Sequence, residues 1–374
     1  MAHSNTLTLF GSFGFGNLGD ELIPHCFRAL LAAAGETRPV KVLSRFRDTQ
    51  IGETAPFPET GQGGPHSGAL ILAGGGIIEP RAMSCMNRAF ALKSDRPGLT
   101  VATHAISVEP GLPFGWRQRR ALQRQLAHIG PTTVRDVLSA EVLMHLAPGH
   151  RTRVIGDTAL WMDPGEVPVD LAAMLPGRAI PVILGDIWET QDFFDWLTGE
   201  LSDLARNLNA ALLLLPFSGV FGKDMPVHRT LRDRLAEIAP DIEVVFPLET
   251  LPFASFSPGA VATILGNAPL VVSMRLHGCV LSYAMHTPFI GLAYHPKLRG
   301  FAETVGARAA LVPHTLPERQ SSGTYGFRFA DLELKPGAMS AAADAVMKDF
   351  DFSAIPYFRR QQVMAVRDLI ARLA

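Results

Sequence analysis

The sequence of 374 residues lacks long hydrophobic runs. No apolar stretch reaches the roughly 18 residues that a membrane-spanning helix needs, and the most apolar piece, residues 210–217, has the length of a strand. The N-terminal residues contain no basic segment and no apolar stretch of signal-peptide length. These absences predict a cytoplasmic protein without a transmembrane segment.

The sequence also lacks an excess of either charge and has few cysteines. It contains 34 Lys and Arg against 35 Asp and Glu, which argues against nucleic-acid binding through bulk charge and against a polybasic membrane anchor. The three cysteines, Cys26, Cys85 and Cys279, are far apart, and no Cys/His group has the spacing of a zinc site. We therefore expect no disulfide framework, no metal site and a reducing compartment.

Several common catalytic motifs are missing: the phosphate-binding G-x-x-x-x-G-K-[ST] loop, H-E-x-x-H and the G-x-S-x-G elbow. Gly14, Gly16 and Gly19 do have the spacing of a dinucleotide fingerprint. However, Asp20 and Glu21 follow at the start of the next helix, where they would repel a pyrophosphate. The sequence therefore favours other enzyme classes over a dehydrogenase.

Short apolar runs alternate with amphipathic stretches along the chain, and 47% of the residues are apolar, enough for a sizeable core. This alternation predicts an α/β fold with parallel sheets. We expect two Rossmann-like domains facing a cleft, residues 1–165 and 176–340, and C-terminal helices at 341–374, for which packing back on the N-terminal domain is one arrangement. The Pro- and Gly-rich stretches 52–68 and 162–178 are predicted as a loop and as the interdomain linker. Strands are expected at 6–10, 40–44, 69–73, 99–107, 132–136, 151–157, 179–187, 211–217, 242–247, 269–273 and 287–294.

Ligands of such folds bind beyond the carboxyl ends of the strands, so the residues found there are the first candidates for a site. One strand ends at Ser273, and Arg275 and His277 lie in the first turn of the helix that follows. Cations there oppose the helix dipole, at a cost of a few tenths to about 1 kcal/mol each, unless an anion binds. Arg275 suits a carboxylate or phosphate, His277 can donate a proton, and Lys297 after the next strand adds charge. The alternative is that Arg275 pairs with a carboxylate of the other domain and that His277 is a core histidine.

Two glycine-containing segments follow strands in the N-terminal half. Asn17 and Asp20 come after the first strand, where Asp20 either caps a helix over 20–34 or joins Asn17 in meeting sugar hydroxyls. Gly75 and Gly76 come after the third strand, where they either let a ligand approach the backbone or form a tight turn.

Other cations in this half have two interpretations each. Arg135 ends a strand and either binds an anionic ligand or pairs locally with Asp136 or Asp157. A predicted helix at 116–129 carries several arginines, which form either a solvated face or a contact with an anionic membrane surface or a lipid diphosphate. These are Arg117, Arg119, Arg120 and Arg124.

With these residues identified, the chain resembles the polysaccharide pyruvyl transferase family over about residues 7–310. The RLHG segment and the later P-K pair are the most specific elements of the match. Glu79, where an Asp is common, and residues 107–110, in place of a more glycine-rich stretch, depart from the family pattern. The matching segments are GNLGDE (16–21), LAGGGIIE (72–79), TVRDVLSAEVL (133–143), VIGD (154–157) and SMRLHGCVLSYAMHTPFIGLAYHPKLRGF (273–301).

The resemblance implies a fold similar to the glycosyltransferase B (GT-B) type, with no cofactor and with phosphoenolpyruvate as donor substrate in the C-terminal domain. The acceptor would be a sugar of an exopolysaccharide or cell-wall glycan precursor, free or lipid-linked, held by the N-terminal domain. The products would be a pyruvate ketal and phosphate. By similarity, the donor contacts would be Arg275, Leu276, His277 and Arg135, and the acceptor would lie near Asn17 and Asp20.

The chemistry implied by this resemblance requires an acid near the donor methylene and a base near the attacking hydroxyl. His277 is the expected acid, since a neighbouring phosphate and carboxylate should raise its pKa above about 6.5. Asp20 is the expected base, with Glu21 in reserve. Arg275 and Arg135 would neutralise the phosphate as it leaves.

Two other functions stay open at this point. A nucleotide-sugar glycosyltransferase of the same architecture would use an acid such as Glu303 to hold the ribose. A non-catalytic glycan-binding relative would use the same surfaces without turnover. The acceptor sugar, the oligomeric state and peripheral contact with the inner face of the membrane are likewise left open by the sequence.

Overall fold

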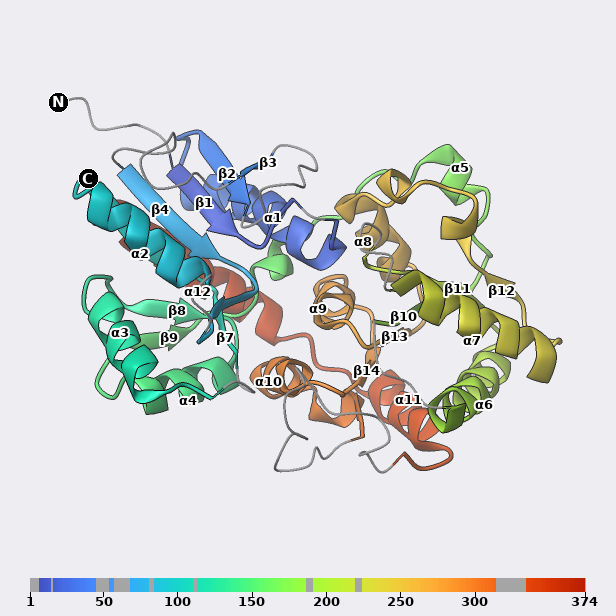
Figure 1. Ribbon diagram of the computed structural model, residues 1–374. Helices are drawn as coiled ribbons and strands as arrows, with labels where there is room; N and C mark the ends of the chain where they lie inside the picture. The colour runs from blue at the N-terminus through green and yellow to red at the C-terminus, as the bar shows by residue number, and fades with distance from the viewer. Residues whose placement is uncertain are drawn as a thin grey trace. The chain divides into compact units, whose positions relative to one another are not determined.

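The computed structural model describes residues 7–14, 16–44, 54–56, 68–80, 84–109, 113–185, 191–218, 224–313 and 334–373. Its contacts divide the chain into two compact units. Unit 1 comprises Met1–Trp161 and Ile355–Ala374, and unit 2 comprises Met162–Ala354. Each unit is an α/β structure built on a parallel sheet (Figure 1).

Unit 1 contains a five-stranded parallel sheet with the order β3-β2-β1-β4-β6. Parallel strands covered by helices on both faces need apolar side chains on both sides, and β4 accordingly is buried over five of its six residues. The strands are β1 (Leu7–Gly11), β2 (Val40–Ser44), β3 (Thr54–Pro56), β4 (Gly68–Ala73) and β6 (Leu99–His104).

Strand β3 corrects one prediction, because it lies inside the stretch 52–68 that the sequence indicates as a loop. Its backbone pairs with β2, with Thr54 opposite Val42. Pro56 ends this short strand, a position that an edge strand tolerates since its outer side needs no ladder hydrogen bond. The other expected strands are all present within a few residues of their predicted bounds.

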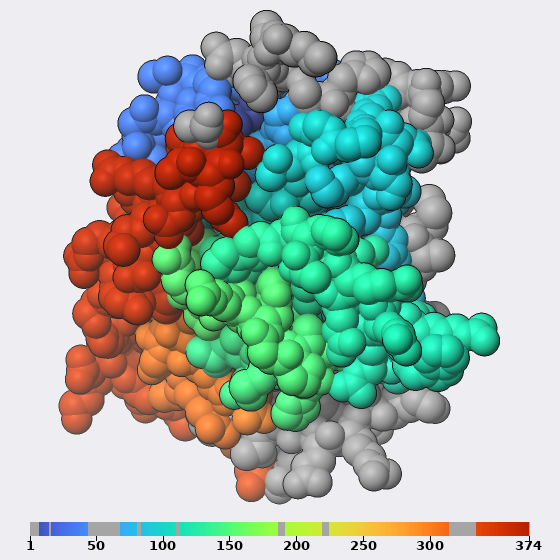
Figure 2. Space-filling model, turned by 90° about the vertical axis from the view of Figure 1, so that its left-hand side faces the viewer, coloured from blue at the N-terminus to red at the C-terminus, as the bar shows by residue number. Residues whose placement is uncertain are grey.

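The rest of unit 1 consists of two small strand pairs and the surrounding helices. The C-terminal helix α12 belongs here: Gln362 Nε2 donates to Asp157 O at 3.0 Å, and Arg359 Nε donates to Leu160 O at 2.8 Å. Figure 2 shows this deep red helix beside the blue-green segments of unit 1. The elements are α1 (Leu18–Ala34), β5 (Gly76–Ile78), α2 (Cys85–Asp95), β7 (Ser107–Val108), α3 (Trp116–Leu126), β8 (Thr132–Val134), α4 (Val137–Leu146), β9 (Thr152–Val154) and α12 (Ala354–Ala371).

Unit 2 contains a six-stranded parallel sheet with the order β12-β11-β10-β13-β14-β15. The short strand β15, which the sequence did not indicate, pairs with β14. The strands are β10 (Ala179–Ile183), β11 (Ala211–Leu214), β12 (Val244–Val245), β13 (Val271–Ser273), β14 (Phe289–Leu292) and β15 (Leu311–Val312), and the helices are α5 (Val169–Ala172), α6 (Gln191–Leu208), α7 (Asp224–Ile238), α8 (Pro258–Gly266), α9 (Leu276–Ala284), α10 (Pro296–Thr304) and α11 (Ala338–Lys348).

The structure assigns the predicted linker and the predicted C-terminal helices to units in a different way from the sequence prediction. The predicted linker, 162–178, lies within unit 2: Gly165 N donates to Gly259 O at 2.9 Å, and Thr263 Oγ1 donates to Gly165 O at 2.6 Å. The predicted segment 341–374 forms two helices, of which α11 belongs to unit 2 and α12 lies almost wholly in unit 1. No helix of the described residues is long and apolar enough to cross a bilayer.

Each sheet has a point where the order of its strands reverses. In unit 1 the chain proceeds from β1 outward to β3 and then returns to place β4 on the other side of β1. In unit 2 it proceeds from β10 to β12 and returns to place β13 beside β10. At such a switch point the loops after the two central strands leave in opposite directions, which opens a crevice for ligands.

His104, the last residue of β6, is buried in unit 1 and packs edge-on against Phe27, with ring centroids 5.1 Å apart. Burial lowers the pKa of His104 to about 3, although Gln362 and Asp157 oppose the shift. Because Gln362 belongs to α12, His104 lies where β6 approaches the C-terminal helix of unit 1.

We expect stability to fall below pH 6.5 because His104 is neutral in the folded state and takes up a proton on unfolding. The unfolded state then binds more protons, so stability is complete above the unfolded pKa and declines as the pH falls toward the folded value. Between about pH 7.5 and 5.5, the wild type should lose about 1.4 kcal/mol more unfolding free energy than His104→Gln in urea titrations. The exposed His25→Gln variant should behave as wild type; an equal pH dependence in all three proteins would contradict the prediction.

Candidate functional site

The predicted acceptor residues lie at the switch point of unit 1, where α1 follows β1. Helix α1 begins at Leu18, and Asn17 is its N-cap: Asn17 Oδ1 accepts from Gly19 N at 3.1 Å. Asn17 Nδ2 in turn donates to Asp20 Oδ2 at 2.9 Å. The prediction that Asp20 caps the helix is therefore wrong, since Asn17 performs that role and orients the Asp20 carboxylate.

The neighbouring Glu21 holds the glycine loop in place. Its Oε1 accepts from Gly14 N at 2.7 Å and from Gly16 N at 3.3 Å. These bonds keep the carboxylate against the loop backbone, whereas Asp20 is turned toward the loop after β4. Glu21 thus positions the loop that precedes α1, and the Asp20 carboxylate is the one that lies near Gly75.

The two glycine-containing loops of unit 1 come together at this point. Gly75 has a positive φ of 51°, and a Cβ added there would lie 3.6 Å from Asp20 Oδ1 and 3.8 Å from Ser12 Oγ. A Cβ at Gly76 would lie 3.0 Å from Glu109 Oε2, which leaves little room for a side chain. The sequence singled out Asp20, Gly75 and Gly76, but it missed Ser12 and Glu109, which carry no motif of their own.

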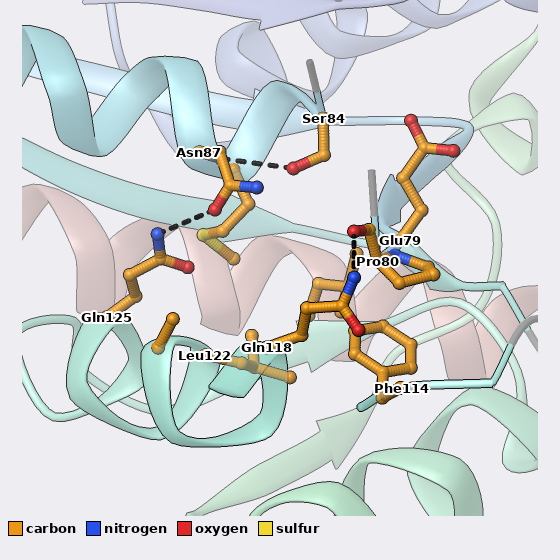
Figure 3. Close-up of a pocket in the computed structure, with 11 residues that line it drawn as sticks. Glu79, Pro80, Ser84, Asn87, Phe114, Gln118, Leu122 and Gln125 are labelled. Atoms are coloured by element: carbon orange, nitrogen blue, oxygen red, sulfur yellow. Dashed lines mark hydrogen bonds between the residues drawn. The ribbon is translucent and has the colours of Figure 1, made fainter. Parts of the chain in front are cut away.

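A pocket of about 70 Å³ lies next to this loop, between α2 and α3 (Figure 3). Gln118 Nε2 donates to Pro80 O at 2.8 Å, and Gln125 Nε2 donates to Asn87 Oδ1 at 2.9 Å. Glu79, which is 8% exposed, also lines the pocket, with its carboxylate on the opposite side of Pro80 from Phe114. The amide groups and the apolar ring of Phe114 that line the pocket are suited to sugar hydroxyls and the apolar face of a sugar.

Arg135 is buried between two carboxylates of unit 1. It is 4% exposed and pairs with Asp136 at 3.1 Å and with Asp157 at 3.4 Å. Asp136 also caps α4, accepting from Ser139 N at 2.7 Å. The structure thus contains the local ion pairs that the sequence allowed, and the donor-binding role of Arg135 stays a prediction.

Arg275 lies at the switch point of unit 2 as the N-cap of α9. Its guanidinium is 24% exposed and pairs with Asp224, which is fully buried at the start of α7. Nε donates to Asp224 Oδ2 at 3.3 Å and Nη2 donates to Oδ1, so the carboxylate holds one edge of the guanidinium. Arg275 therefore has a carboxylate partner within its own unit, whereas the sequence alternative had placed that partner in the other domain.

Asp224 is fixed by the backbone around it. Its Oδ2 accepts from Phe217 N at 3.2 Å and from Ser218 N at 3.0 Å, and its carbonyl oxygen contacts His228 Nδ1 at 2.8 Å. Burial lowers the pKa of His228, which favours a neutral ring below Asp224. The sequence missed Asp224, although an acidic residue at a helix start after a buried strand was the signal that could have indicated it.

His277 and Lys297 occupy equivalent positions after adjacent strands. Strands β13 and β14 are paired with Ser273 opposite Gly291, so α9 and α10 begin at the same edge of the sheet. His295, which the sequence did not select, caps α10 by accepting from Lys297 N at Nδ1, 3.1 Å away. Two helix N-termini with a cation near each make this a candidate anion-binding edge.

The remaining residues of the RLHG segment are explained by packing. A Cβ at Gly278 would overlap Ser273 Oγ and come within 2.9 Å of Ile183 Cδ1, so only glycine lets α9 lie this close to the sheet. Leu276 is the first residue of α9. Burial raises the pKa of the Cys279 thiol to about 12, which keeps it protonated and unsuited to be a nucleophile.

The structure thus assigns the predicted residues to two groups. Asn17, Asp20, Glu21, Gly75, Gly76 and Arg135 belong to unit 1, and Arg275, Leu276, His277 and Lys297 belong to unit 2. Glu303, the acid expected to hold a ribose in a glycosyltransferase, lies near the end of α10 and pairs with Arg299 at 2.8 Å. Within the described residues, no cluster of His, Cys, Asp or Glu has the composition of a metal site.

Two parallel α/β units define a GT-B-like fold, which solved structures share. The chain is similar to UDP-N-acetylglucosamine 2-epimerase from Rickettsia bellii, with 11% identity and a TM-score of 0.53 over 98% of each chain. It is also similar to MnaA of S. aureus in a structure with UDP, with 11% identity and a TM-score of 0.53 over 99% of this chain and 97% of that chain. No curated protein matches it in sequence.

The sequence identifies the protein family, which is more specific than the fold class that the structural similarity shows. The family model described as polysaccharide pyruvyl transferase matches residues 17–296, which include the unit 1 group and, of the unit 2 group, Arg275, Leu276 and His277. The chain belongs to the polysaccharide pyruvyl transferase family and is a transferase.

The ion pair between Asp224 and Arg275 should contribute strongly to stability. Asp224→Asn removes the charge that compensates a largely buried guanidinium, so we expect a loss of about 3 kcal/mol in unfolding free energy. The exposed pair of Asp233 with Arg232 provides the control, and Asp233→Asn should cost less than about 1 kcal/mol. Chemical denaturation of both variants measures the difference; equal losses would show that the Asp224 pair is energetically unimportant.

Proposed function

We propose that the protein transfers the pyruvyl group of phosphoenolpyruvate to two hydroxyls of a sugar, forming a cyclic ketal and releasing phosphate. The observation that carries this proposal is Arg275, held by buried Asp224 at the switch point of unit 2. Family membership supports the transfer reaction. An exopolysaccharide or cell-wall glycan precursor in the cytoplasm is the acceptor class that we propose with it.

The donor is proposed to bind at the edge where α9 and α10 begin. Phosphoenolpyruvate carries a carboxylate and a phosphate, and both suit helix N-termini flanked by cations. Asp224 holds the Nε–Nη2 edge of Arg275, which directs the other edge of the guanidinium away from the carboxylate. Arg275 and Lys297 would bind the two anionic groups and stabilise the phosphate as it leaves.

The acceptor is proposed to bind at the unit 1 switch point, near Asp20 and Gly75. The proximity of Gly75 to the Asp20 carboxylate supports this assignment, because a glycine lets a sugar approach the backbone there. The pocket beside Glu79 would accept a neighbouring sugar ring. The two buried ion pairs of Arg135 favour a role in holding the loop after β8.

The proposed reaction has two steps that balance in protons and bonds. Asp20 takes the proton of the first hydroxyl as its oxygen bonds to C2 of phosphoenolpyruvate, and His277 gives a proton to the methylene, which becomes a methyl group. The second hydroxyl then bonds to C2 as the C2–O bond to phosphate breaks, and its proton passes to the departing phosphate, which leaves as hydrogen phosphate. Proton return from Asp20 to His277 through solvent restores the starting state.

The alternative of a nucleotide-sugar glycosyltransferase receives less support. The structure of MnaA, which shares the fold, was solved with UDP. For this reason the binding experiment below includes nucleotides. However, Glu303 is paired with Arg299 near the end of α10, whereas the anion-binding edge lies at the beginning of that helix.

Thermal unfolding with phosphoenolpyruvate, UDP, GDP and NAD, each added separately, tests the function. At about 100 times its dissociation constant a ligand adds about 2.7 kcal/mol of stability, so phosphoenolpyruvate should raise Tm by several degrees. Arg275→Lys keeps the charge but loses the planar fork, so this shift should largely disappear, whereas Arg299→Lys should retain it. A shift with UDP or GDP alone would overturn the proposal in favour of a glycosyltransferase.

His277→Ala should separate donor binding from chemistry. The variant should keep the Tm shift with phosphoenolpyruvate, but phosphate release with a panel of diol-bearing glycosides should fall by about 100-fold to 10,000-fold, the usual contribution of a general acid. The exposed His25→Ala variant serves as the control and should turn over normally. Wild-type turnover by His277→Ala would remove this residue from the acid role.

A further inference from the structure

Helix α3 of unit 1 presents an unusual outer surface. Trp116, its first residue, is 69% exposed, and the guanidinium of Arg117 lies 5.1 Å from the centroid of its ring. Leu122 and Leu126 are buried on the opposite side of the helix. At 3.6 residues per turn, one side of α3 combines the tryptophan with three arginines, all exposed. We call this surface the basic face of α3: Trp116, Arg117, Arg120 and Arg124.

The arginines of the basic face have no carboxylate partner among the residues that the structure describes. Exposed arginines elsewhere do: Arg206, for example, pairs with Asp241 at 2.9 Å. Arg120 and Arg124 are four residues apart and repel one another, at a cost of a few tenths of a kcal/mol. Arg117 lies in the first turn, where a cation also opposes the helix dipole. A merely solvated face would carry both signs of charge and no exposed tryptophan.

We propose that the basic face of α3 docks on an anionic lipid surface. Guanidinium groups bind lipid phosphates, and tryptophan favours the boundary between headgroups and acyl chains. Charge complementarity identifies the partner, since the chain as a whole carries a formal net charge of −1 and the basic face concentrates positive charge. With a single large apolar residue on this face, binding is shallow, reversible and sensitive to salt.

The helix that carries the basic face also contacts the proposed acceptor side of unit 1. Gln118, on the side of α3 turned away from the basic face, donates to Pro80 O, a few residues beyond Gly76 in the chain. Figure 1 shows α3 beside α4, and Arg119 Nη2 donates to His145 O of α4 at 2.6 Å. Docking through the basic face would therefore place the loop at Pro80 about one helix diameter, roughly 10 Å, from the lipid headgroups. If the proposed function holds, this favours a lipid-linked saccharide as acceptor.

Vesicle flotation with the full chain tests the docking. The protein should bind vesicles of phosphatidylcholine containing about one third phosphatidylglycerol at about 0.1 M salt, and lose that binding at about 0.5 M. Pure phosphatidylcholine vesicles should not bind it. The double variant Arg120→Gln/Arg124→Gln should bind anionic vesicles about 25-fold more weakly, at about fivefold per arginine. Trp116→Ala should also weaken binding and should remove a blue shift of tryptophan fluorescence.

The control variant, Arg206→Gln/Arg232→Gln, removes the same charge from helices of unit 2 and should bind as wild type. Equal weakening in both double variants, or no binding of the wild type to anionic vesicles, would overturn the proposal. Tighter binding to duplex DNA than to vesicles, lost in the α3 variant, would assign the face to nucleic acid instead. The assay contains neither phosphoenolpyruvate nor a sugar, so its failure leaves the proposed transfer reaction standing.

Discussion

The pairing of a buried carboxylate with an arginine at a sheet edge organises unit 2. Asp224 is inaccessible to solvent, and ionised carboxylates are buried only where hydrogen bonds and a counter-charge compensate them. Backbone amides after β11 and the guanidinium of Arg275 after β13 supply that compensation. The pair therefore ties together loops on both sides of β10, and it fixes an arginine where the strand order reverses. The proposed anion-binding edge depends on this constraint more than on any single helix N-terminus.

Unit 1 achieves a comparable arrangement with hydrogen bonds between neighbours in the chain. Asn17 caps α1 and orients Asp20, while Glu21 holds the preceding loop. Gly75 completes the arrangement because its missing side chain lets the loop after β4 approach Asp20. The two units thus fix a charged side chain at the switch point in different ways. Unit 2 uses a long-range ion pair, and unit 1 uses local caps and a glycine contact.

This difference explains which features could be predicted from the sequence. Continuous apolar runs indicated the parallel strands, and the residues after them indicated both switch-point groups. Asp20 and Arg275 were selected because each stands beside a helix start. The pairing of Asp224 with Arg275 was missed because the two residues are 51 positions apart in the chain, and no local pattern links them. Strand β3 was missed because backbone pairing at an edge needs no apolar pattern. His295 was missed because a histidine that caps a helix through Nδ1 has no sequence signature.

The return of the chain to unit 1 has a consequence for its synthesis on the ribosome. Unit 2 is continuous from Met162 to Ala354, so all its strands are made before α12. Unit 1 begins first but is completed last, because Gln362 and Arg359 of α12 bind to the backbone at Asp157 and Leu160. The surface under α12 therefore stays uncovered until α12 itself leaves the exit tunnel. The unit that is begun first thus exposes apolar surface for longer during synthesis.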